Sequence, residues 1–192
     1  SDMGLRKFYC TPHIMSDFFK NDASTIMPAL ELVREAVKEQ GIPVEVHAAA
    51  EYYVDDGFVR KLETEKLLTF NNNMLLFEVS YINCPENIDH IIFRMQVLGY
   101  KPVMAHPERY PFWYRDFSRY QSFRDQGVLL QVNLNSLTGY YGPEARQIAI
   151  RLADENMIDL LGTDCHHERH LEGIRKGLKE PVVRRLLESG CL

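Results

Sequence analysis

The 192-residue sequence has few cysteines, and none of them lies in a Cys-x-x-Cys pair. The four are Cys10, Cys84, Cys165 and Cys191. Their wide spacing excludes a zinc knuckle and a thioredoxin-type redox motif. A chain of this size does not need disulfides to fold, so we expect a reducing, cytoplasmic location.

Long apolar runs are absent as well. Runs such as Met74–Phe77 are far shorter than the ~18 residues that a membrane span needs, and no signal segment opens the chain. Lysine and arginine number 22 against 27 aspartates and glutamates, for a net charge of −5, and no basic block occurs. We therefore expect neither a membrane span nor a nucleic-acid partner.

Several signatures of phosphate chemistry are missing. There is no Gly-x-Gly-x-x-Gly or other Gly-rich phosphate loop, which disfavours a nucleotide-binding open sheet. A cysteine phosphatase needs an arginine six positions after its cysteine, but the residues at that offset are Ser16, His90 and Leu171. A Gly-x-Ser-x-Gly nucleophile elbow is also absent. The sequence therefore gives no support for catalysis by a cysteine or serine nucleophile of these two types.

What the chain does contain is an alternation of apolar and amphipathic segments. Apolar residues make up 45% and charged residues 26%, which is typical of a globular protein, and the length fits a single domain over residues 1–192. The expected strands are Lys7–Cys10, Val44–Ala50, Met74–Ser80, Pro102–Ala105, Val128–Val132 and Ile158–Gly162.

Helical spacing of apolar residues fills the intervals between these strands. The expected helices are Thr25–Gln40, Phe58–Leu68, Pro85–Leu98, Phe117–Asp125, Pro143–Asn156, Leu171–Leu178 and Val182–Leu187. Apolar strands that alternate with helices indicate an α/β protein whose parallel sheet is buried on both sides. Either a (β/α) barrel or an open doubly wound sheet satisfies this pattern.

Each expected strand runs into, or has near its carboxyl end, a polar residue that can bind a metal or a substrate. These residues are His13, Glu51, Glu78, His106, Asn133 and Asp164, and His166 follows closely. Because the carboxyl ends of parallel strands share one face, we expect these side chains to converge there. Imidazole and carboxylate suit Zn, Mn or Fe, paired metals suit attack on phosphorus, and Arg109 can bind a phosphate. The pattern predicts a metal-dependent hydrolase.

Each of these residues also has a structural interpretation when taken alone. A single His after a strand is more often structural, Glu51 and Glu78 can be helix-entry carboxylates, and Asp164 can be an N-cap. Their repetition at one topological position favours a site. We interpret His47 and His90 as structural and Tyr140-Tyr141 as packing or pocket-rim aromatics. The string from His167 to His170 is one residue too short for a His-Glu-x-x-His zinc motif.

Four strings together resemble the PHP (polymerase and histidinol phosphatase) superfamily: Thr11-Pro12-His13, the strand end at Glu51, His106-Pro107-Glu108-Arg109-Tyr110 and Asp164-Cys165-His166. The string that begins at His106 is similar to the one found in the CpsB-like branch. Members of this branch are manganese-dependent protein-tyrosine phosphatases encoded with capsule and exopolysaccharide genes. The resemblance covers Lys7 to about His166. It implies a distorted seven-stranded (β/α) barrel with a trinuclear metal site at the carboxyl ends of the strands.

The resemblance also implies roles for individual residues. Glu51, Glu78 and His106 match the ligands of one metal; Glu51 bridges to a second metal shared with Asp164; His13 and His166 match ligands of the third. Arg109 and His166 are the implied catalytic residues, and Arg109 and Arg169 the implied substrate-binding ones. The implied cofactor is Mn²⁺, or Fe or Zn, with up to three ions in a complete site.

The chain departs from the family pattern at its start. The family begins with a strand that ends in His-x-His, followed by an Asp-Asp-Gly turn. Here Asp55-Asp56-Gly57 has the letters but follows Glu51, so we do not transfer that role. We expect a PHP-like domain in which the first strand and its motif are missing from this chain.

The leading hypothesis is a metal-dependent protein-tyrosine phosphatase that acts on an autophosphorylated bacterial tyrosine kinase. Two alternatives stay open. One is a PHP phosphoesterase for a small phosphate ester such as histidinol phosphate. The other is a catalytically impaired PHP-like binding protein.

Overall fold

The computed structural model describes residues 3–188 of the chain. They divide into two compact units, which we treat separately. The first unit comprises Ser1–Val79 and Pro85–Pro102, and the second comprises Ser80–Cys84 and Val103–Leu192. The expectation of a single domain over the whole chain stays a prediction.

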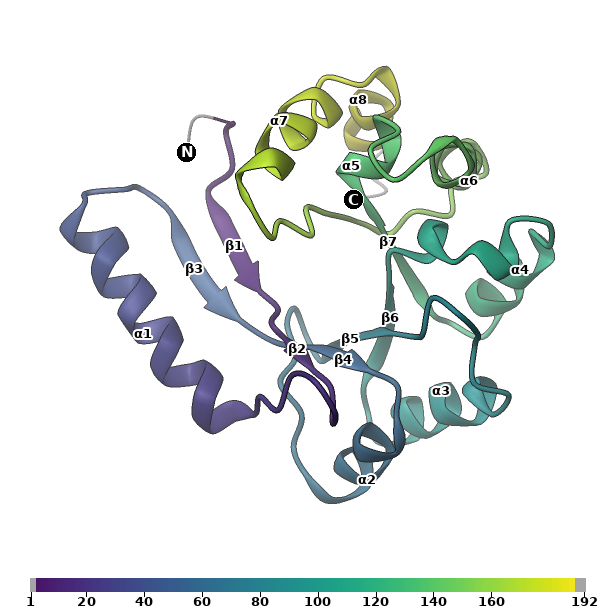
Figure 1. Ribbon diagram of the computed structural model, residues 1–192, viewed down its shortest axis with the longest axis horizontal. Helices are drawn as coiled ribbons and strands as arrows, with labels where there is room; N and C mark the ends of the chain where they lie inside the picture. The colour runs from purple at the N-terminus through teal and green to yellow at the C-terminus, as the bar shows by residue number, and fades with distance from the viewer. Residues whose placement is uncertain (1–2, 189–192) are drawn as a thin grey trace. The chain divides into compact units, whose positions relative to one another are not determined.

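The first unit consists of parallel strands and three helices (Figure 1). Its elements are β1 (Lys7–Cys10), β2 (His13–Ile14), α1 (Ala23–Glu39), β3 (Glu45–Ala48), β4 (Glu51–Tyr53), α2 (Asp56–Thr64), β5 (Met74–Glu78) and α3 (Ile88–Val97). Strand β1 pairs in parallel with β3, while β2, β4 and β5 form a second parallel ladder. The α/β class and the parallel pairing agree with the expectation from sequence.

The expected strand Val44–Ala50 is wrong at its carboxyl end. The structure has two short strands there, β3 and β4, so Glu51 lies within a strand and not beyond one. The pairing continues through the interruption, because the amides of Ala49 and Glu51 donate to the carbonyls of Cys10 and Pro12. The same interruption separates β1 from β2, which places His13 in a strand of its own.

Helix α1 begins at Ala23, two residues before the predicted start. Asp22 explains the earlier start: it accepts a hydrogen bond from the amide of Thr25, whose hydroxyl accepts one from the amide of Asp22. This reciprocal capping box satisfies amides that otherwise lack partners. Arg34 ties the helix to β3 by donating to the carbonyl of Val46.

Helix α2 ends at Thr64, four residues before the predicted end at Leu68. The amides of Leu67 and Leu68 donate instead to the hydroxyls of Tyr100 and Tyr52, which draws this segment out of helical geometry. An ion pair between Glu63 and Arg94 joins α2 to α3.

The second unit continues the alternation of strands and helices. Its elements are β6 (Lys101–Ala105), which leads into it, η1 (Pro107–Arg109), η2 (Pro111–Trp113), α4 (Ser118–Asp125), β7 (Leu129–Asn133), α5 (Leu134–Leu137), α6 (Pro143–Asp154), β8 (Leu160–Gly162), α7 (Glu168–Gly177) and α8 (Pro181–Glu188). Strands β6, β7 and β8 pair in parallel in that order. Val103, Met104 and Leu130 are fully buried, as expected for strands covered on both faces.

Candidate metal and phosphate site

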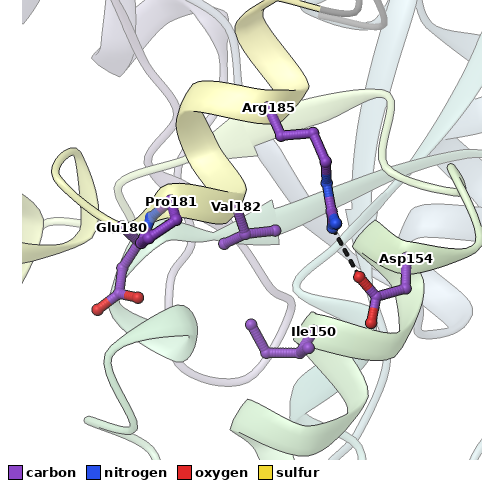
Figure 2. A pocket seen from close by; sticks show the side chains of 6 residues that line it. All are labelled: Ile150, Asp154, Glu180, Pro181, Val182 and Arg185. Carbon is purple, nitrogen blue, oxygen red and sulfur yellow. Dashed lines mark hydrogen bonds and ion pairs between the residues drawn. The ribbon is translucent and has the colours of Figure 1, made fainter.

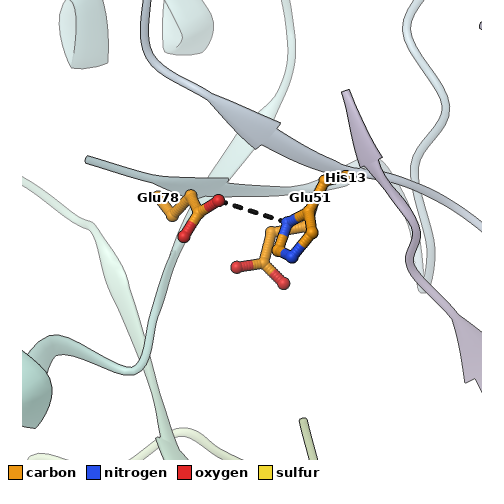
Figure 3. Close-up of side chains that lie close together, drawn as sticks. All are labelled: His13, Glu51 and Glu78. Atoms are coloured by element: carbon orange, nitrogen blue, oxygen red, sulfur yellow. Dashed lines mark ion pairs between the residues drawn. The ribbon is translucent and has the colours of Figure 1, made fainter. Parts of the chain in front are cut away.

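Three predicted metal ligands of the first unit come together. His13 lies in β2, Glu51 in β4 and Glu78 at the end of β5 (Figure 3). His13 is in register with Glu51, and Glu78 is in register with Tyr53, two residues after Glu51. Because side chains two residues apart in a strand share a face, the three side chains project to one side.

The chemistry of this trio suits a divalent ion. One ligand atom from each residue lies within 4.8 Å of the others, and His13 Nδ1 is 3.2 Å from Glu78 Oε1. Two ligand atoms of one zinc-sized ion lie at most about 4.3 Å apart, so the trio is close to the spacing that an ion requires. Glu51 and Glu78 are both buried, and buried carboxylates are typically hydrogen-bonded, paired with a cation or bound to a metal. Imidazole with two carboxylates fits Mn, Fe or Zn.

The remaining predicted ligands, His106, Asp164 and His166, belong to the second unit. His106 follows β6 with φ 35°, and Asp164 follows β8 with φ 45°. Positive φ is uncommon for residues other than glycine, and such strained positions concentrate at functional sites. The amide of His106 donates to the carbonyl of Gln131 in β7, which holds this residue at the strand end.

Asp164 is the centre of a polar cluster in the second unit. Its Oδ2 accepts hydrogen bonds from Arg109 Nη1 at 2.7 Å and from Asn133 Nδ2 at 2.9 Å. Its Oδ1 lies 3.2 Å from His166 Nδ1. The structure thus brings together Arg109, Asn133, Asp164 and His166, which come from the ends of β6, β7 and β8.

Arg109 also lies against two tyrosine rings. Its guanidinium carbon is 5.0 Å from the ring centroid of Tyr81 and 4.1 Å from that of Tyr141. Burial opposes the charge of Arg109, but Tyr81 and Asp164 outweigh it and raise the pKa of Arg109. Burial also raises the pKa of Tyr141 to about 12, so its hydroxyl stays neutral. The sequence carries no signal that singles out Tyr81.

Glu108, to which the sequence analysis assigned no role, is fully buried beside Arg109. Its Oε1 accepts hydrogen bonds from the amide of Asn133 at 3.0 Å and from the hydroxyl of Ser136 at 2.5 Å. Burial raises the pKa of Glu108. These bonds tie η1 to β7 and α5, and so fix the backbone that carries Arg109.

Arg169 occupies an exposed position in α7. Among residues 3–188, no hydrogen bond or ion pair is seen between Arg169 and Asp164 or Arg109, so its substrate-binding role stays a prediction. The rings of His167 and His170 are in contact, with centroids 3.9 Å apart and planes tilted by 47°, and burial lowers the pKa of His170.

Neither His47 nor His90 belongs to the two polar clusters, and their structural interpretation stays a prediction. His47 stacks on Tyr9 in the first unit, and His90 lies in α3. Asp55 caps α2 by accepting from the amide of Phe58, and its other oxygen accepts from the amide of Ser16. The Asp-Asp-Gly letters at this point therefore begin a helix.

The surface has a pocket in each unit, and only the pocket of the first unit lies near a polar cluster. One, of about 390 Å³, lies between α6 and α8 in the second unit and is lined by Ile150, Asp154, Glu180, Pro181, Val182 and Arg185 (Figure 2). No member of either cluster lines it. The other, of about 220 Å³, includes Phe19 and Asn21 in the first unit. It lies beside the metal trio, because Asn21 donates to the carbonyl of His13 and Phe19 packs against the His13 ring.

A family model for capsular polysaccharide synthesis, CpsB/CapC, matches residues 1–180. The chain belongs to this family. The resemblance to the CpsB-like branch that the sequence motifs indicated is thereby confirmed.

Named relatives and a solved structure agree with the family. The chain is 26% identical over 165 residues to the tyrosine-protein phosphatase YwqE of Bacillus subtilis, covering 85% of this chain and 65% of that protein. It is 24% identical over 170 residues to the tyrosine-protein phosphatase CpsB of Streptococcus pneumoniae, covering 85% of this chain and 70% of that protein. The chain thus spans about two thirds of the length of these relatives.

The fold has a match among solved structures. A chain from the crystal structures of YwqE from Bacillus subtilis and CpsB from Streptococcus pneumoniae, described as unique metal-dependent tyrosine phosphatases, matches with a TM-score of 0.84 and 23% identity. The match covers 97% of this chain and 79% of that one. At this identity, the likeness shows a shared fold.

The described residues also bear on disulfide bonds and on membrane-spanning helices. Cys10, Cys84 and Cys165 form no disulfide, and Cys191 lies outside the described residues. Of the helices within residues 3–188, none combines the length and the apolarity that crossing a bilayer requires.

Proposed function

We propose that this chain carries the catalytic part of a metal-dependent protein-tyrosine phosphatase. The observation that carries the proposal is the trio His13, Glu51 and Glu78, a nitrogen and two carboxylates gathered from three neighbouring strands. Membership of the capsular polysaccharide synthesis family and the names of its relatives support the same activity. The substrate we propose is phosphotyrosine on a bacterial tyrosine autokinase that controls capsule or exopolysaccharide synthesis in the cytoplasm.

The proposed metal is Mn²⁺, with up to three ions in a complete site. In the first unit His13, Glu51 and Glu78 would hold it, and in the second His106, Asp164 and His166 offer further nitrogen and oxygen ligands. Bound divalent ions supply Lewis-acid stabilisation of phosphoryl oxygens and make water acidic enough to attack near neutral pH.

The protein side chains contribute binding and charge. Arg109 is the proposed phosphate ligand, because a guanidinium offers paired N–H donors that match phosphate oxygens. Its link to Asp164 holds one of those nitrogens, Nη1, at a defined place. Charge that develops on the phosphoryl oxygens would be stabilised by a cation that is already oriented. His166 and Arg169 are proposed as further catalytic and substrate-binding residues.

We propose that the parallel ladders of both units belong to a distorted seven-stranded (β/α) barrel. The fold shared with a solved tyrosine phosphatase chain supports this assignment. A barrel places the carboxyl ends of all its strands on one face, so in such a barrel the polar residues that follow these strands would share that face.

The decisive test is a matched substrate and metal panel on the purified protein. We expect Mn²⁺-dependent release of phosphate from p-nitrophenyl phosphate and from a phosphotyrosine peptide, abolished by a chelator and restored by excess Mn²⁺. The same peptide carrying phosphoserine is the control and is expected to be turned over poorly. Activity that resists the chelator, or none with Mn²⁺, would contradict the proposal.

Two other outcomes identify the alternatives. Faster turnover of histidinol phosphate than of the phosphotyrosine peptide would indicate a small-ester phosphoesterase. Tight binding of the phosphotyrosine peptide, without turnover of any ester and with no more than one metal per chain, would indicate a catalytically impaired binding protein.

A further inference from the structure

The guanidinium of Arg109 is held by more than its ion pair. It approaches the rings of Tyr81 and Tyr141, with centroid distances of 5.0 and 4.1 Å, while Nη1 donates to Asp164. Contacts of this kind between a guanidinium and an aromatic face are attractive, and more so away from water. Arg109 is largely buried, with 21% of its side chain exposed.

Tyr141 owes its place to a turn that only glycine forms easily. Gly139 and Gly142 flank the two tyrosines and have φ of 82° and 104°, in the region that favours glycine. The amide of Tyr140 donates to the carbonyl of Asn135, and the amide of Gly142 donates to the carbonyl of Gly139. The turn between α5 and α6 therefore fixes the backbone that carries the Tyr141 ring.

Tyr81 is held by two aromatic rings of the His-Pro-Glu-Arg-Tyr string. Its ring stacks on His106, with centroids 5.7 Å apart and planes 15° apart, and it also contacts Tyr110. Tyr110 is fully buried, and its hydroxyl donates to the carbonyl of Ala105. Tyr81 thus rests on residues of the same string that contains Arg109.

An unrestrained arginine side chain has many rotamers, and ordering it opposes the binding of a phosphate. A ring that meets the guanidinium through its face leaves the N–H donors, which lie in the guanidinium plane, for oxygen acceptors. Among the described residues, Asp164 alone accepts a hydrogen bond from this guanidinium. The rings therefore restrict Arg109 without occupying its remaining donors.

We propose that Tyr81 and Tyr141 are positioning residues that hold the Arg109 guanidinium ready for the phosphate oxygens of the substrate. The inference rests on the proposed phosphatase function and deepens it. Neither tyrosine needs to touch the substrate. A misplaced binding group can lower an enzyme's efficiency by about 100-fold, so the effect of removing a ring should be measurable.

Tyr141 gives the cleaner test, because Tyr81 also contacts His106. In the purified Mn²⁺-loaded protein we expect Tyr141→Leu to raise the KM for p-nitrophenyl phosphate and the inhibition constant of inorganic phosphate by about 10-fold each. Tyr141→Phe keeps the ring and should restore both to within about 2-fold of the parent protein. Phe117→Leu removes a ring whose centroid lies 3.6 Å from the guanidinium carbon of a different arginine, Arg151. It is the matched control and should behave like the parent.

A purely structural role would give a different pattern. Loss of folded protein lowers kcat with KM and the phosphate inhibition constant unchanged, and that pattern in Tyr141→Leu would overturn the inference. A second check uses Arg109→Lys, whose ammonium lacks the planar fork. Combined with Arg109→Lys, Tyr141→Leu should add less than about 3-fold, because the group it positions is already gone. Full additivity would also overturn the inference.

The phosphatase activity and the positioning role are distinguished by separate outcomes. If the parent protein has no Mn²⁺-dependent phosphatase activity, the proposed function fails and the positioning role fails with it. If the parent is active and Tyr141→Leu leaves its KM and phosphate inhibition unchanged, only the positioning role fails.

Discussion

Arg109 and Asp164, 55 positions apart in the sequence, form an ion pair in which Nη1 lies 2.7 Å from Oδ2. The pair joins the His-Pro-Glu-Arg-Tyr string to the Asp-Cys-His string, two motifs that lie far apart in the sequence. Only 9% of the Asp164 side chain is exposed. Removing one member of such a pair leaves the other charge without its partner in a poorly hydrated place.

The first prediction concerns Arg109. We expect Arg109→Ala to lower kcat/KM for a phosphotyrosine peptide by about 100- to 1000-fold, the usual loss when an oriented charge stabiliser is removed. Bound manganese, measured by elemental analysis, should change much less. Arg115→Ala removes an exposed arginine of the same unit and serves as the control. Activity equal to that of the parent would exclude Arg109 as a phosphate ligand.

The second prediction concerns the metal trio. A ligand that binds only the folded state stabilises it, by about 2.7 kcal/mol at a concentration 100 times its Kd. Mn²⁺ should therefore raise the Tm of the parent protein, and Glu51→Gln or Glu78→Gln should remove most of that rise. Glu45→Gln, at an exposed position of β3, should keep it. An unchanged Mn²⁺-induced shift in both trio variants would rule out this site.

The third prediction concerns pH. Arg94 donates from Nε and Nη2 to both carboxylate oxygens of Glu63 and lowers the pKa of Glu63 below its ordinary value of 4.5. A lowered folded-state pKa means that this contribution to stability is present above about pH 4.5 and is lost as pH falls through the folded value. Arg94→Gln should thus give a small drop in Tm at pH 7 that shrinks towards pH 3.

The control for this pH series is Arg60→Gln, which removes an exposed arginine of α2. No ion pair of Arg60 occurs among the described residues, so its Tm difference from the parent should vary little with pH. If the Arg94 and Arg60 variants show the same dependence on pH, the Glu63 pair contributes nothing specific.

The fourth prediction concerns the packing of α7 on α5. A Cβ atom added to Gly177 would lie 2.8 Å from the backbone carbonyl oxygen of Leu134, which has no side-chain freedom to move away. We expect Gly177→Ala to lower the free energy of unfolding by about 1–3 kcal/mol, as overpacking usually does. Arg175→Ala, at an exposed position of the same helix, should change it by less than about 0.5 kcal/mol. A denaturant titration compares the two, and equal midpoints would contradict the prediction.

Much of the site was predictable because chemistry recurs at one topological position. Polar residues that follow apolar segments stand out against their surroundings, and parallel pairing then places them on neighbouring strands. His13, Glu51 and Glu78 were found in this way, and so was the group around Asp164. The ligand roles of these residues stay predictions until metal binding is measured.

Other features could not be read from local patterns. The break between β3 and β4 depends on pairing with residues near Cys10 and Pro12, which lie some forty positions earlier. The two-residue alternation of a strand is the same on either side of such a break, so periodicity does not reveal it. The short helices η1 and α5 were not predicted for a similar reason, since three or four residues are too few to show a helical period.

The sequence by itself determined the α/β class, the parallel alternation, the family and the set of residues able to hold a metal or a phosphate, because these depend on composition, order and motif spacing. The tertiary structure alone decided that Tyr81 and Tyr141 meet Arg109, that Glu108 is buried under Asn133 and Ser136, and that Asp164 faces the arginine. The physical reason is distance along the chain. Such contacts join segments that are far apart in the sequence, and the local pattern of one segment does not predict which other segment it will meet.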